Sequence, residues 1–394
     1  MKLFLSLTLL SLYVLVQVTL CVDNVQSEDC KTRINTFKGQ LKDRKLGPNS
    51  FLRKVKGCWK DLRNDETLFS ISLQDFNINC KNTDDRNSKK KVFYQNIERA
   101  ENLSDDDDEA TFGITLATFM DPNEFIQKRL MKPRSVDDPT GGIIDEINEG
   151  TKKIIDKVEE EKNKILDKLK EFENDKKTKK AIVSVDLRSQ NAVNPIKDQG
   201  NCGSCWSFAT VATMETSYYQ KNRALLNLSE QQFVNCDKQD SGCDGGWMSS
   251  AYTYAKGTGI AQNSTNPYIA KEQNCTAPVG TTVKVRSYTQ LTAKYPTAII
   301  NALNSGYAVA IALQSSTSQF MYYTGGILTN ASVCTGNTVD HAVTIIGYNT
   351  VNNTNYWIVR NSWGTNWGES GYVRIKRGIN YCNMEAYPFI VTIV

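Results

Sequence analysis

The sequence predicts an α+β protein whose first 180 residues differ chemically from the rest of the chain. Residues 1–180 hold 33 basic and 32 acidic side chains, whereas the longer stretch 181–394 holds only 14 and 11. A stretch with so few charges can bury a large apolar core. Within residues 181–394 a single helical pattern precedes several strand patterns without regular βαβ alternation, which favours an α+β arrangement.

The first 21 residues resemble a secretory signal peptide. Lys2 precedes an apolar run from Leu3 to Val16 that is relieved only by Ser and Thr, and cleavage is expected near Cys21. The alternative is an uncleaved anchor helix, which usually needs about 20 apolar residues. We therefore expect residues 1–21 to be a signal peptide and the chain to enter the secretory pathway.

The remainder of the N-terminal region is highly charged and helical in pattern. Residues 143–172 carry apolar side chains at helical spacing and predict a long amphipathic helix. This helix is either a free-standing charged linker or a docking element. The acidic run 105–109 predicts a solvated loop, and the basic stretch 176–180 predicts a site open to proteolysis.

The C-terminal region, residues 181–394, combines a helix with several strands. Apolar residues at helical spacing predict a helix at Ser204–Tyr219, and alternating patterns predict four strands. These strands are expected at Ala308–Leu313, Ala342–Tyr348, Tyr356–Val359 and Tyr372–Lys376.

The composition excludes several classes of function. A net charge of +4 over this length does not indicate a nucleic-acid binder. The chain has a single His, so a His-rich zinc site or an HExxH helix cannot form. Any mechanism that needs imidazole must use His341, although a single His is more often incidental. We expect no metal and no cofactor.

Cys205 stands where a reactive thiol is expected. It begins the predicted helix, and the N–H groups and dipole of a helix N-terminus favour a thiolate and a lowered pKa. A nucleophilic thiolate needs a base, and the base needs a group that holds its tautomer. His341 and Asn361 supply such groups later in the chain. The pair Cys202 and Cys205 has two alternative interpretations, a redox motif and half of a zinc site, but no βαβ context or second pair supports either.

Four blocks of sequence in the C-terminal region resemble the mature domain of papain-like cysteine proteases. The first covers Val185–Arg188 and the second runs from Gln199 to Trp206, with the local signature Cys-Gly-Ser-Cys-Trp. The third covers Asp340–Val343, and the fourth begins at Asn361-Ser362-Trp363-Gly364. The resemblance implies a two-lobed fold with a helical left lobe and a β-barrel-like right lobe over residues 181–394.

The resemblance also implies the role of each catalytic residue. Cys205 would be the nucleophile, His341 the base and acid, and Asn361 the group that orients the imidazole. Gln199 would donate a hydrogen bond to the oxyanion, and Trp363 would shield the His–Asn bond from water. In this interpretation His341 is the one side chain expected to show an imidazole pKa near neutrality.

Substrate-binding residues follow from the same resemblance. Gly245 and Gly246 match the rung that pairs with an extended substrate, where the absence of a Cβ permits close approach. Trp367 matches a wall on the leaving-group side. The second subsite is expected to be apolar and to prefer a hydrophobic residue, with Tyr387 limiting its depth; its expected residues are Met248, Ile311, Val339, Ala342 and Tyr387.

The cysteines and sequons agree with secretion. Seven Cys in the C-terminal region leave one thiol free and allow 15 pairings of the other six. The resemblance implies Cys202–Cys243, Cys236–Cys275 and Cys334–Cys382, and it leaves the pairing of Cys30, Cys58 and Cys80 open. Candidate glycosylation sequons occur at Asn102, Asn227, Asn263, Asn274, Asn330 and Asn352.

Upstream of residue 181 the resemblance is weaker and concerns the helical propeptide of the family. Phe93-x-x-Asn96 and the stretch Phe119–Phe125 match it, whereas Ala100 and Ala117 depart from it. Residues 22–180 are therefore expected to be an inhibitory propeptide. The block from Tyr356 to Trp363 resembles mite group 1 allergen proteases most.

The resemblance implies a secreted cysteine endopeptidase zymogen of an extracellular, lysosomal or digestive compartment. Its expected partners are protein and peptide substrates, its own propeptide and cystatin-type inhibitors, with no nucleic acid and no membrane after signal removal. Exopeptidase variants need additional His residues, which the chain lacks. Two alternatives stay open: a catalytically silent relative that acts as a binder or antigen, and an acyl-transferring relative on the same fold.

Overall fold

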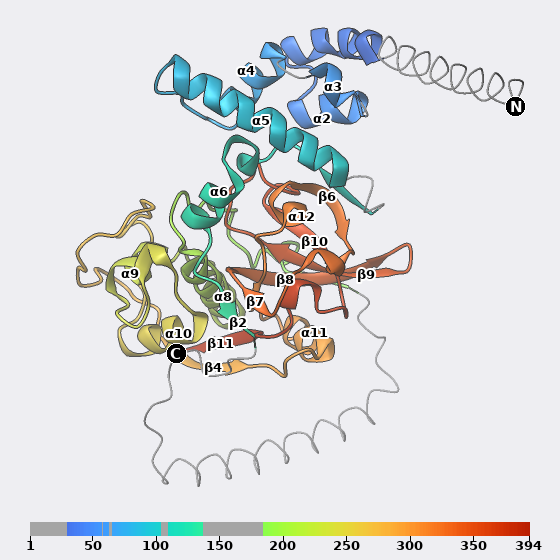
Figure 1. Cartoon of the computed structure of the whole chain (residues 1–394). Coiled ribbons are helices and arrows are strands. Elements are labelled where there is room, and N and C mark those ends of the chain that lie inside the picture. The colour runs from blue at the N-terminus through green and yellow to red at the C-terminus, as the bar shows by residue number, and fades with distance from the viewer. Residues whose placement is uncertain (1–29, 57, 63–64, 104–108, 137–183) are drawn as a thin grey trace, which may run out of the picture.

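The computed structural model of the chain describes residues 30–56, 58–62, 65–103, 109–136 and 184–394. Five expectations fall wholly or mostly outside these residues, namely the signal peptide at 1–21, the acidic loop at 105–109, the helix at 143–172, the basic stretch at 176–180 and the boundary between 180 and 181. Figure 1 shows a layer of helices lying across one end of an α+β body. We call residues 30–136 the leading segment and residues 184–394 the main domain.

The leading segment is mainly helical. Residues 30–42 are helical, and the later elements are α2 (Pro48–Lys54), α3 (Trp59–Leu62), α4 (Glu66–Asp75), α5 (Thr83–Leu103), β1 (Ala110–Phe112), η1 (Leu116–Phe119), α6 (Pro122–Arg129) and β2 (Arg134–Ser135). Asp65 and Asp121 begin α4 and α6, because each carboxylate accepts hydrogen bonds from two N–H groups of the first turn. The helices enclose a core of their own around Phe51, Leu68 and Phe69.

Helix α5 is held to η1 by the motif that the sequence singled out. The Phe93 ring is fully buried and lies 5.3 Å from Phe69 and 5.0 Å from Phe119 between ring centres. The Asn96 side-chain amide donates to the carbonyl of Met120 at 2.9 Å and to that of Thr118 at 3.2 Å. These contacts fix the turn from which α6 enters the main domain.

The main domain has a helical lobe and a sheet lobe. The helical lobe contains α8 (Cys205–Asn222), α9 (Glu230–Cys236), η3 (Gly242–Asp244) and α10 (Met248–Gly257). The remaining elements are β3 (Val185–Asp186), β4 (Val285–Gln290), α11 (Pro296–Asn304), β5 (Val309–Leu313), α12 (Ser318–Met321), β6 (Tyr323–Leu328), η4 (Ala331–Val333), β7 (Thr338–Val339), β8 (His341–Val351), β9 (Thr354–Arg360), β10 (Tyr372–Lys376), η5 (Tyr381–Asn383) and β11 (Phe389–Ile393). The predicted helix and the four predicted strands are confirmed, with only their ends shifted.

One nine-stranded sheet joins most of these strands. Its order is β1-β6-β10-β9-β8-β5-β11-β4, with β3 paired to β8, and the pairs are antiparallel except β6 with β10. The α+β class that the sequence predicts is confirmed. The register of β5 and β8 sets Leu313 opposite His341, which places the start of β8 beside the helical lobe.

The leading segment supplies the edge strand β1 of this sheet. Ala110 pairs with Gly326, whose φ is +83°. A Cβ at Gly326 would lie 2.0 Å from the carbonyl oxygen of Glu109, so only Gly permits the pairing. The leading segment is therefore bound through backbone hydrogen bonds as well as side chains.

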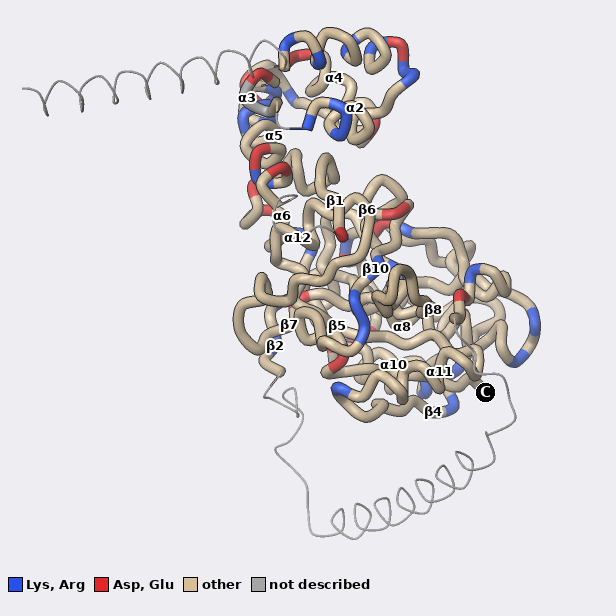
Figure 2. Tube along the Cα trace, turned by 90° about the vertical axis from the view of Figure 1, so that its right-hand side faces the viewer, with Lys and Arg blue, Asp and Glu red and all other residues tan. Residues whose placement is uncertain are grey.

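The charge difference between the two regions is visible in the structure. Figure 2 shows Lys, Arg, Asp and Glu crowded on the helices of the leading segment, whereas most of the main domain carries other residues. The main domain instead buries two apolar clusters, one within the sheet lobe and one between α8, α10 and strands β5, β8 and β11. The second cluster includes Cys205, so the site lies where the two lobes meet.

Among the described residues, no helix has the length and apolar character needed to cross a membrane.

Candidate active site

Cys205 is the first residue of α8 and is fully buried. The preceding loop is tied down by the Cys202–Cys243 disulfide. Gly203 in this loop fits tightly, since a Cβ there would lie 2.6 Å from the carbonyl oxygen of Cys243 and 2.9 Å from that of Leu130. The sulfur is thereby held at the helix N-terminus, under residues of the leading segment.

His341 begins β8 and is oriented by Asn361. The two side chains are joined by a 2.7 Å hydrogen bond between His341 Nε2 and Asn361 Oδ1, and both are buried. The Trp363 ring lies against the imidazole at 4.7 Å between centres. This packing keeps water from the bond and leaves Nδ1 as the free ring nitrogen, which has no hydrogen-bond partner among the described residues.

The closed site holds both reactive groups in their neutral forms. Burial lowers the pKa of His341 to about 4, against the hydrogen bond that the imidazole donates to Asn361 Oδ1. Burial also raises the pKa of the Cys205 thiol to about 12, against backbone hydrogen bonds from Ala342 and Met131. The predictions of a lowered thiol pKa and of an imidazole pKa near neutrality are wrong for this closed state, because burial disfavours the charged form of each group.

The Gln199 side chain contacts the leading segment directly. Its Oε1 accepts from Ser362 Oγ at 2.6 Å, and its Nε2 donates to the carbonyls of Arg129 and Cys202, each at 2.8 Å. The amide that the resemblance assigns to the oxyanion therefore binds a peptide carbonyl of the leading segment. Arg129 is itself buried, and its guanidinium forms an ion pair with Asp198 at 3.3 Å.

Residues 130–136 continue through the site in extended form. The N–H of Met131 donates to the carbonyl of Asp340 at 3.0 Å, and β2 pairs antiparallel with β7. On the opposite side, a Cβ at Gly245 would lie 2.8 Å from the Cβ of Met131. The segment thus lies between the two lobes, next to Cys205.

Most of the predicted substrate-binding residues come together around this segment. Met131 shares an apolar cluster with Cys205 and with the predicted residues Met248, Val339, Ala342 and Tyr387. Gly246 has a different neighbour, since a Cβ there would lie 2.5 Å from the Trp206 ring. Trp367 lies in the cluster of the sheet lobe, with its ring 5.3 Å from Trp363.

Ile311 does not join the predicted subsite. It lies in the cluster of the sheet lobe, whereas its neighbours Ala310 and Ala312 lie in the cluster with Cys205. Side chains alternate between the two faces of a strand, so a shift of one residue along β5 exchanges the faces. The two alanines therefore take the place that the resemblance assigned to Ile311.

Comparison with known proteins identifies the family. The profile described as papain family cysteine protease matches residues 182–392. The chain belongs to the papain family of cysteine proteases. Chymopapain of Carica papaya is 39% identical over 196 residues, which cover 49% of this chain and 54% of chymopapain. The chain spans about half the length of the curated relatives it matches first.

Solved structures of the papain family extend the likeness into the leading segment. The proform of Amb a 11, a cysteine protease and major ragweed pollen allergen, has a TM-score of 0.68 at 26% identity and covers 84% of this chain and 87% of that chain. A structure reported for the mite allergens Blo t 1 and Der p 1 has a TM-score of 0.63 at 24% identity, covers 81% of this chain and 97% of that chain, and concerns the fold alone. The arrangement of leading segment and main domain is thus that of papain-family proforms.

The disulfides implied by the resemblance to the papain family are confirmed. Cys202–Cys243, Cys236–Cys275 and Cys334–Cys382 all form, and Cys30–Cys58 closes the leading segment. Cys80 and Cys205 are the free thiols among the described residues. Four disulfides suit an oxidising compartment. The six sequon asparagines are at least partly exposed.

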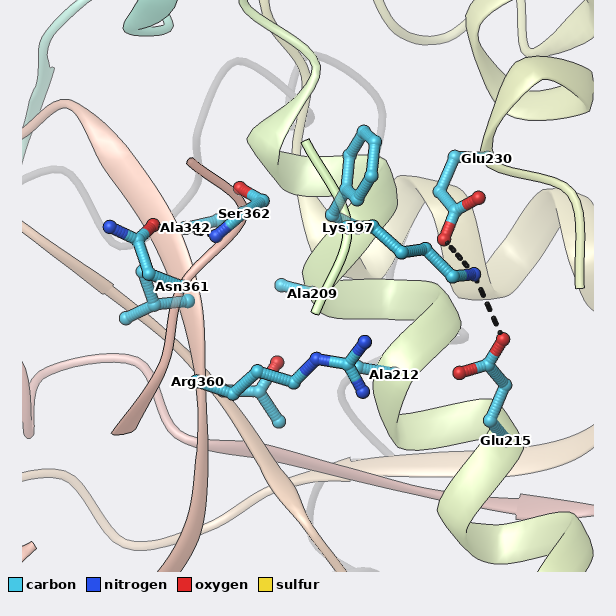
Figure 3. Close-up of a pocket in the computed structure, with 12 residues that line it drawn as sticks. Lys197, Ala209, Ala212, Glu215, Glu230, Ala342, Arg360, Asn361 and Ser362 are labelled. Carbon is cyan, nitrogen blue, oxygen red and sulfur yellow. Dashed lines mark hydrogen bonds and ion pairs between the residues drawn. The ribbon is translucent and has the colours of Figure 1, made fainter. Parts of the chain in front are cut away.

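A buried charge cluster beside the site was missed in the sequence. Lys197 lies between Glu215 of α8 and Glu230 of α9, with its Nζ 3.1 Å and 2.6 Å from their carboxylate oxygens (Figure 3). Burial alone would lower the pKa of Lys197, but the two carboxylates raise it. Lys197 precedes Gln199 by two residues, so the cluster anchors the loop that carries the amide. Proximity to the Gln199–Trp206 block was the only signal in the sequence.

The described residues contain no group of three or more His, Cys, Asp or Glu side chains that could hold a metal ion.

Arg129 and Met131 were also missed in the sequence, because their sequence neighbourhood carries no motif. Only the path of the leading segment shows that they lie at the reactive pair.

Proposed function

We propose that the chain is the zymogen of a secreted cysteine endopeptidase. In this proposal residues 1–21 are a signal peptide, residues 22–180 an inhibitory propeptide and residues 181–394 the peptidase. Its site of action is outside the cell or in a lysosomal or digestive compartment. The substrates are proteins and peptides, and cystatin-type proteins are candidate inhibitors. Glycosylation at the exposed sequons belongs to the same proposal.

The observation that carries the proposal is the hydrogen bond from Gln199 to the Arg129 carbonyl. This amide binds a peptide carbonyl two residues before Met131, whose backbone lies at the Cys205 sulfur, so the chain's own backbone occupies the place where the carbonyl of a substrate would be held. Here the bound peptide belongs to the chain itself and covers the site. We infer that the leading segment inhibits the enzyme until it is removed.

Removal of the segment would expose the pair to water and permit the proton transfer that catalysis requires. Cys205 Sγ would give its proton to Nδ1 of His341, which is the unpartnered nitrogen. The thiolate would then attack the peptide carbonyl, with Gln199 donating to the oxyanion. The imidazolium would protonate the departing amine, and water would hydrolyse the thioester to release the acid and restore the thiol.

The second-subsite preference in this proposal is for a hydrophobic residue. Met131 already fills the apolar cluster formed by Met248, Val339 and Ala342, with Ala310 and Ala312 from β5. Endopeptidase rather than exopeptidase activity is favoured because His341 is the single His of the chain. A catalytically silent or acyl-transferring relative is the alternative.

The decisive experiment compares the processed wild type with Cys205→Ala. The full chain is expressed, processed by a second protease for both variants, and assayed under reducing, mildly acidic conditions with a fluorogenic peptide that carries Leu before the residue at the scissile bond. We expect thiol-dependent cleavage by the processed wild type alone, and none by the unprocessed protein at neutral pH. No cleavage by the processed wild type would show that the protease proposal is wrong and would favour the silent relative.

A further inference from the structure

The hydroxyl of Tyr268 joins two parts of the active-site loop that are not adjacent in the chain. It donates a hydrogen bond to the backbone carbonyl of Gln199 at 2.8 Å, and the Ser204 hydroxyl oxygen lies 2.5 Å from it. A phenol has one proton to donate, so Ser204 is the donor in the second contact. Gln199 carries the amide assigned to the oxyanion, and Ser204 directly precedes Cys205. The Tyr268 hydroxyl therefore ties together both ends of the loop.

Each end of this loop supplies one donor to the oxyanion. The Gln199 side-chain amide donates to the carbonyl of Cys202 and to that of Arg129, and the latter occupies the place of a substrate carbonyl. Cys205 is the first residue of α8, and the first N–H groups of a helix have no partner within the helix. The Cys205 N–H is thus the second donor. The distance between the two donors depends on how the intervening loop is held.

Tyr268 is itself held firmly by the helical lobe. The buried side chain of Gln231 from α9 accepts from the N–H of Ile269 at 2.9 Å and donates to the carbonyl of Lys271 at 2.7 Å. The Phe208 ring of α8 meets the Tyr268 ring edge-on at 4.8 Å between centres. These contacts fix the backbone beside the tyrosine and the plane of its ring. The hydroxyl is therefore presented to the loop at a defined position.

The segment around Tyr268 also packs directly against the loop. Gly200 has a φ of +59°, and a Cβ there would lie 2.9 Å from the Cβ of Ala270. A side chain at Gly200 would push the two segments apart. Burial raises the pKa of the Tyr268 hydroxyl, so this group keeps the proton that it donates to Gln199.

We propose that Tyr268 is a positioning residue that sets the distance between the two oxyanion donors. This inference rests on the proposed peptidase function. The hydroxyl acts through its contacts with Gln199 and Ser204 rather than on the substrate. Without it both donors remain but the loop between them is less constrained, so the loss of rate should be smaller than when a donor is removed.

The test compares Tyr268→Phe with the processed wild type and with the control Tyr295→Phe, which changes an exposed tyrosine. With the Leu-containing fluorogenic peptide, Tyr268→Phe should lower kcat roughly tenfold and leave KM nearly unchanged, because the oxyanion forms only after binding. The rate at which iodoacetamide alkylates Cys205 should not change, since displacement of iodide by the thiolate forms no oxyanion. Tyr295→Phe should match the wild type in all three measurements.

A double variant tests whether Tyr268 acts through Gln199. Gln199→Ala already removes one donor, so adding Tyr268→Phe to it should lower kcat much less than in the wild-type background. A role in general stability would instead give the same loss in both backgrounds. An equal loss in both backgrounds, an unchanged kcat in Tyr268→Phe, or a parallel fall in the alkylation rate would overturn the inference.

Ser204→Ala provides a second variant that does not depend on the folding of Tyr268→Phe. It removes the other contact of the hydroxyl and should lower kcat while leaving the alkylation rate unchanged. An unchanged kcat in Ser204→Ala would overturn the inference and leave the peptidase function intact. No cleavage by the processed wild type would contradict the proposed function itself.

Discussion

At the scale of single residues, the environment of each atom decides the chemistry of the site. The imidazole has one nitrogen bound to Asn361 and the other unpartnered, which makes Nδ1 of His341 the available proton acceptor. Burial holds this nitrogen and the Cys205 thiol neutral in the closed form. The thiol therefore keeps its proton in the closed form, whereas in the proposed open form it would give that proton to the imidazole.

Gln199→Ala should lower kcat of the processed enzyme about 10²-fold to 10³-fold, because it removes one donor to the oxyanion. KM for a Leu-containing peptide should change far less. Steady-state kinetics on processed protein measures both values, with the exposed Gln190→Ala as the matched control. A fall in kcat of less than about tenfold would contradict the oxyanion assignment.

At the scale of elements, the loop before α8 is positioned by helices rather than by its own sequence. Lys197 binds the carboxylates of Glu215 and Glu230, which come from different helices. Both Glu side chains are 1% exposed, and burial raises the pKa of Glu230. The cluster thus joins α8 and α9 and holds the loop that ends at Gln199.

Lys197→Met should destabilise the main domain by about 3–5 kcal/mol, because it leaves two buried carboxylates without their cation. Urea unfolding of the full Cys205→Ala chain measures the effect. Adding Glu215→Gln and Glu230→Gln to Lys197→Met should recover much of the loss, and the surface control Lys256→Met should cost little. A single variant as stable as the control would show that the ion pairs are unimportant.

At the scale of the whole molecule, the leading segment and the main domain form one closed unit. Strand β1 completes the large sheet, β2 pairs with β7, and Arg129 is buried beside Asp198 at the reactive pair. The closed unit depends on a neutral imidazole, since the charge of Arg129 acts on His341 as well. Protonation of the site therefore opposes closure.

The leading segment should loosen as the pH falls from 6.5 towards 4. His341 has a pKa of about 4 in the closed form and an ordinary value of 6.5 when exposed, so closure is favoured above pH 6.5 and that contribution is lost towards pH 4. Hydrogen exchange of residues 130–136 in full-length Cys205→Ala measures the opening. The contributions of other carboxyl groups, such as Asp340, whose pKa is raised by burial, remain when His341 is changed.

A second variant, Cys205→Ala with His341→Phe, separates the pH dependence that is due to the imidazole from that of the carboxyl groups. It should show a flatter pH dependence of hydrogen exchange between pH 6.5 and 4. An identical pH profile in both proteins would assign the loosening to other groups and contradict the role of His341.

By itself, the sequence was sufficient for the fold class and the strands, because these depend on local patterns along the chain. The resemblance to the papain family, carried by short motifs, implied the three disulfides of the main domain and the set of Gln199, Cys205, His341 and Asn361. The Phe93-x-x-Asn96 motif likewise marked the helix that anchors the leading segment.

Only the tertiary structure decided which face of β5 meets the site, which cation lies between Glu215 and Glu230, and which backbone carbonyl Gln199 binds. These facts depend on strand register and on contacts between residues far apart in sequence, which no local pattern encodes. The pKa values of Cys205 and His341 likewise depend on the tertiary structure. Burial sets them, with smaller effects from the Met131 backbone and the Arg129 charge, and burial is a property of the folded chain.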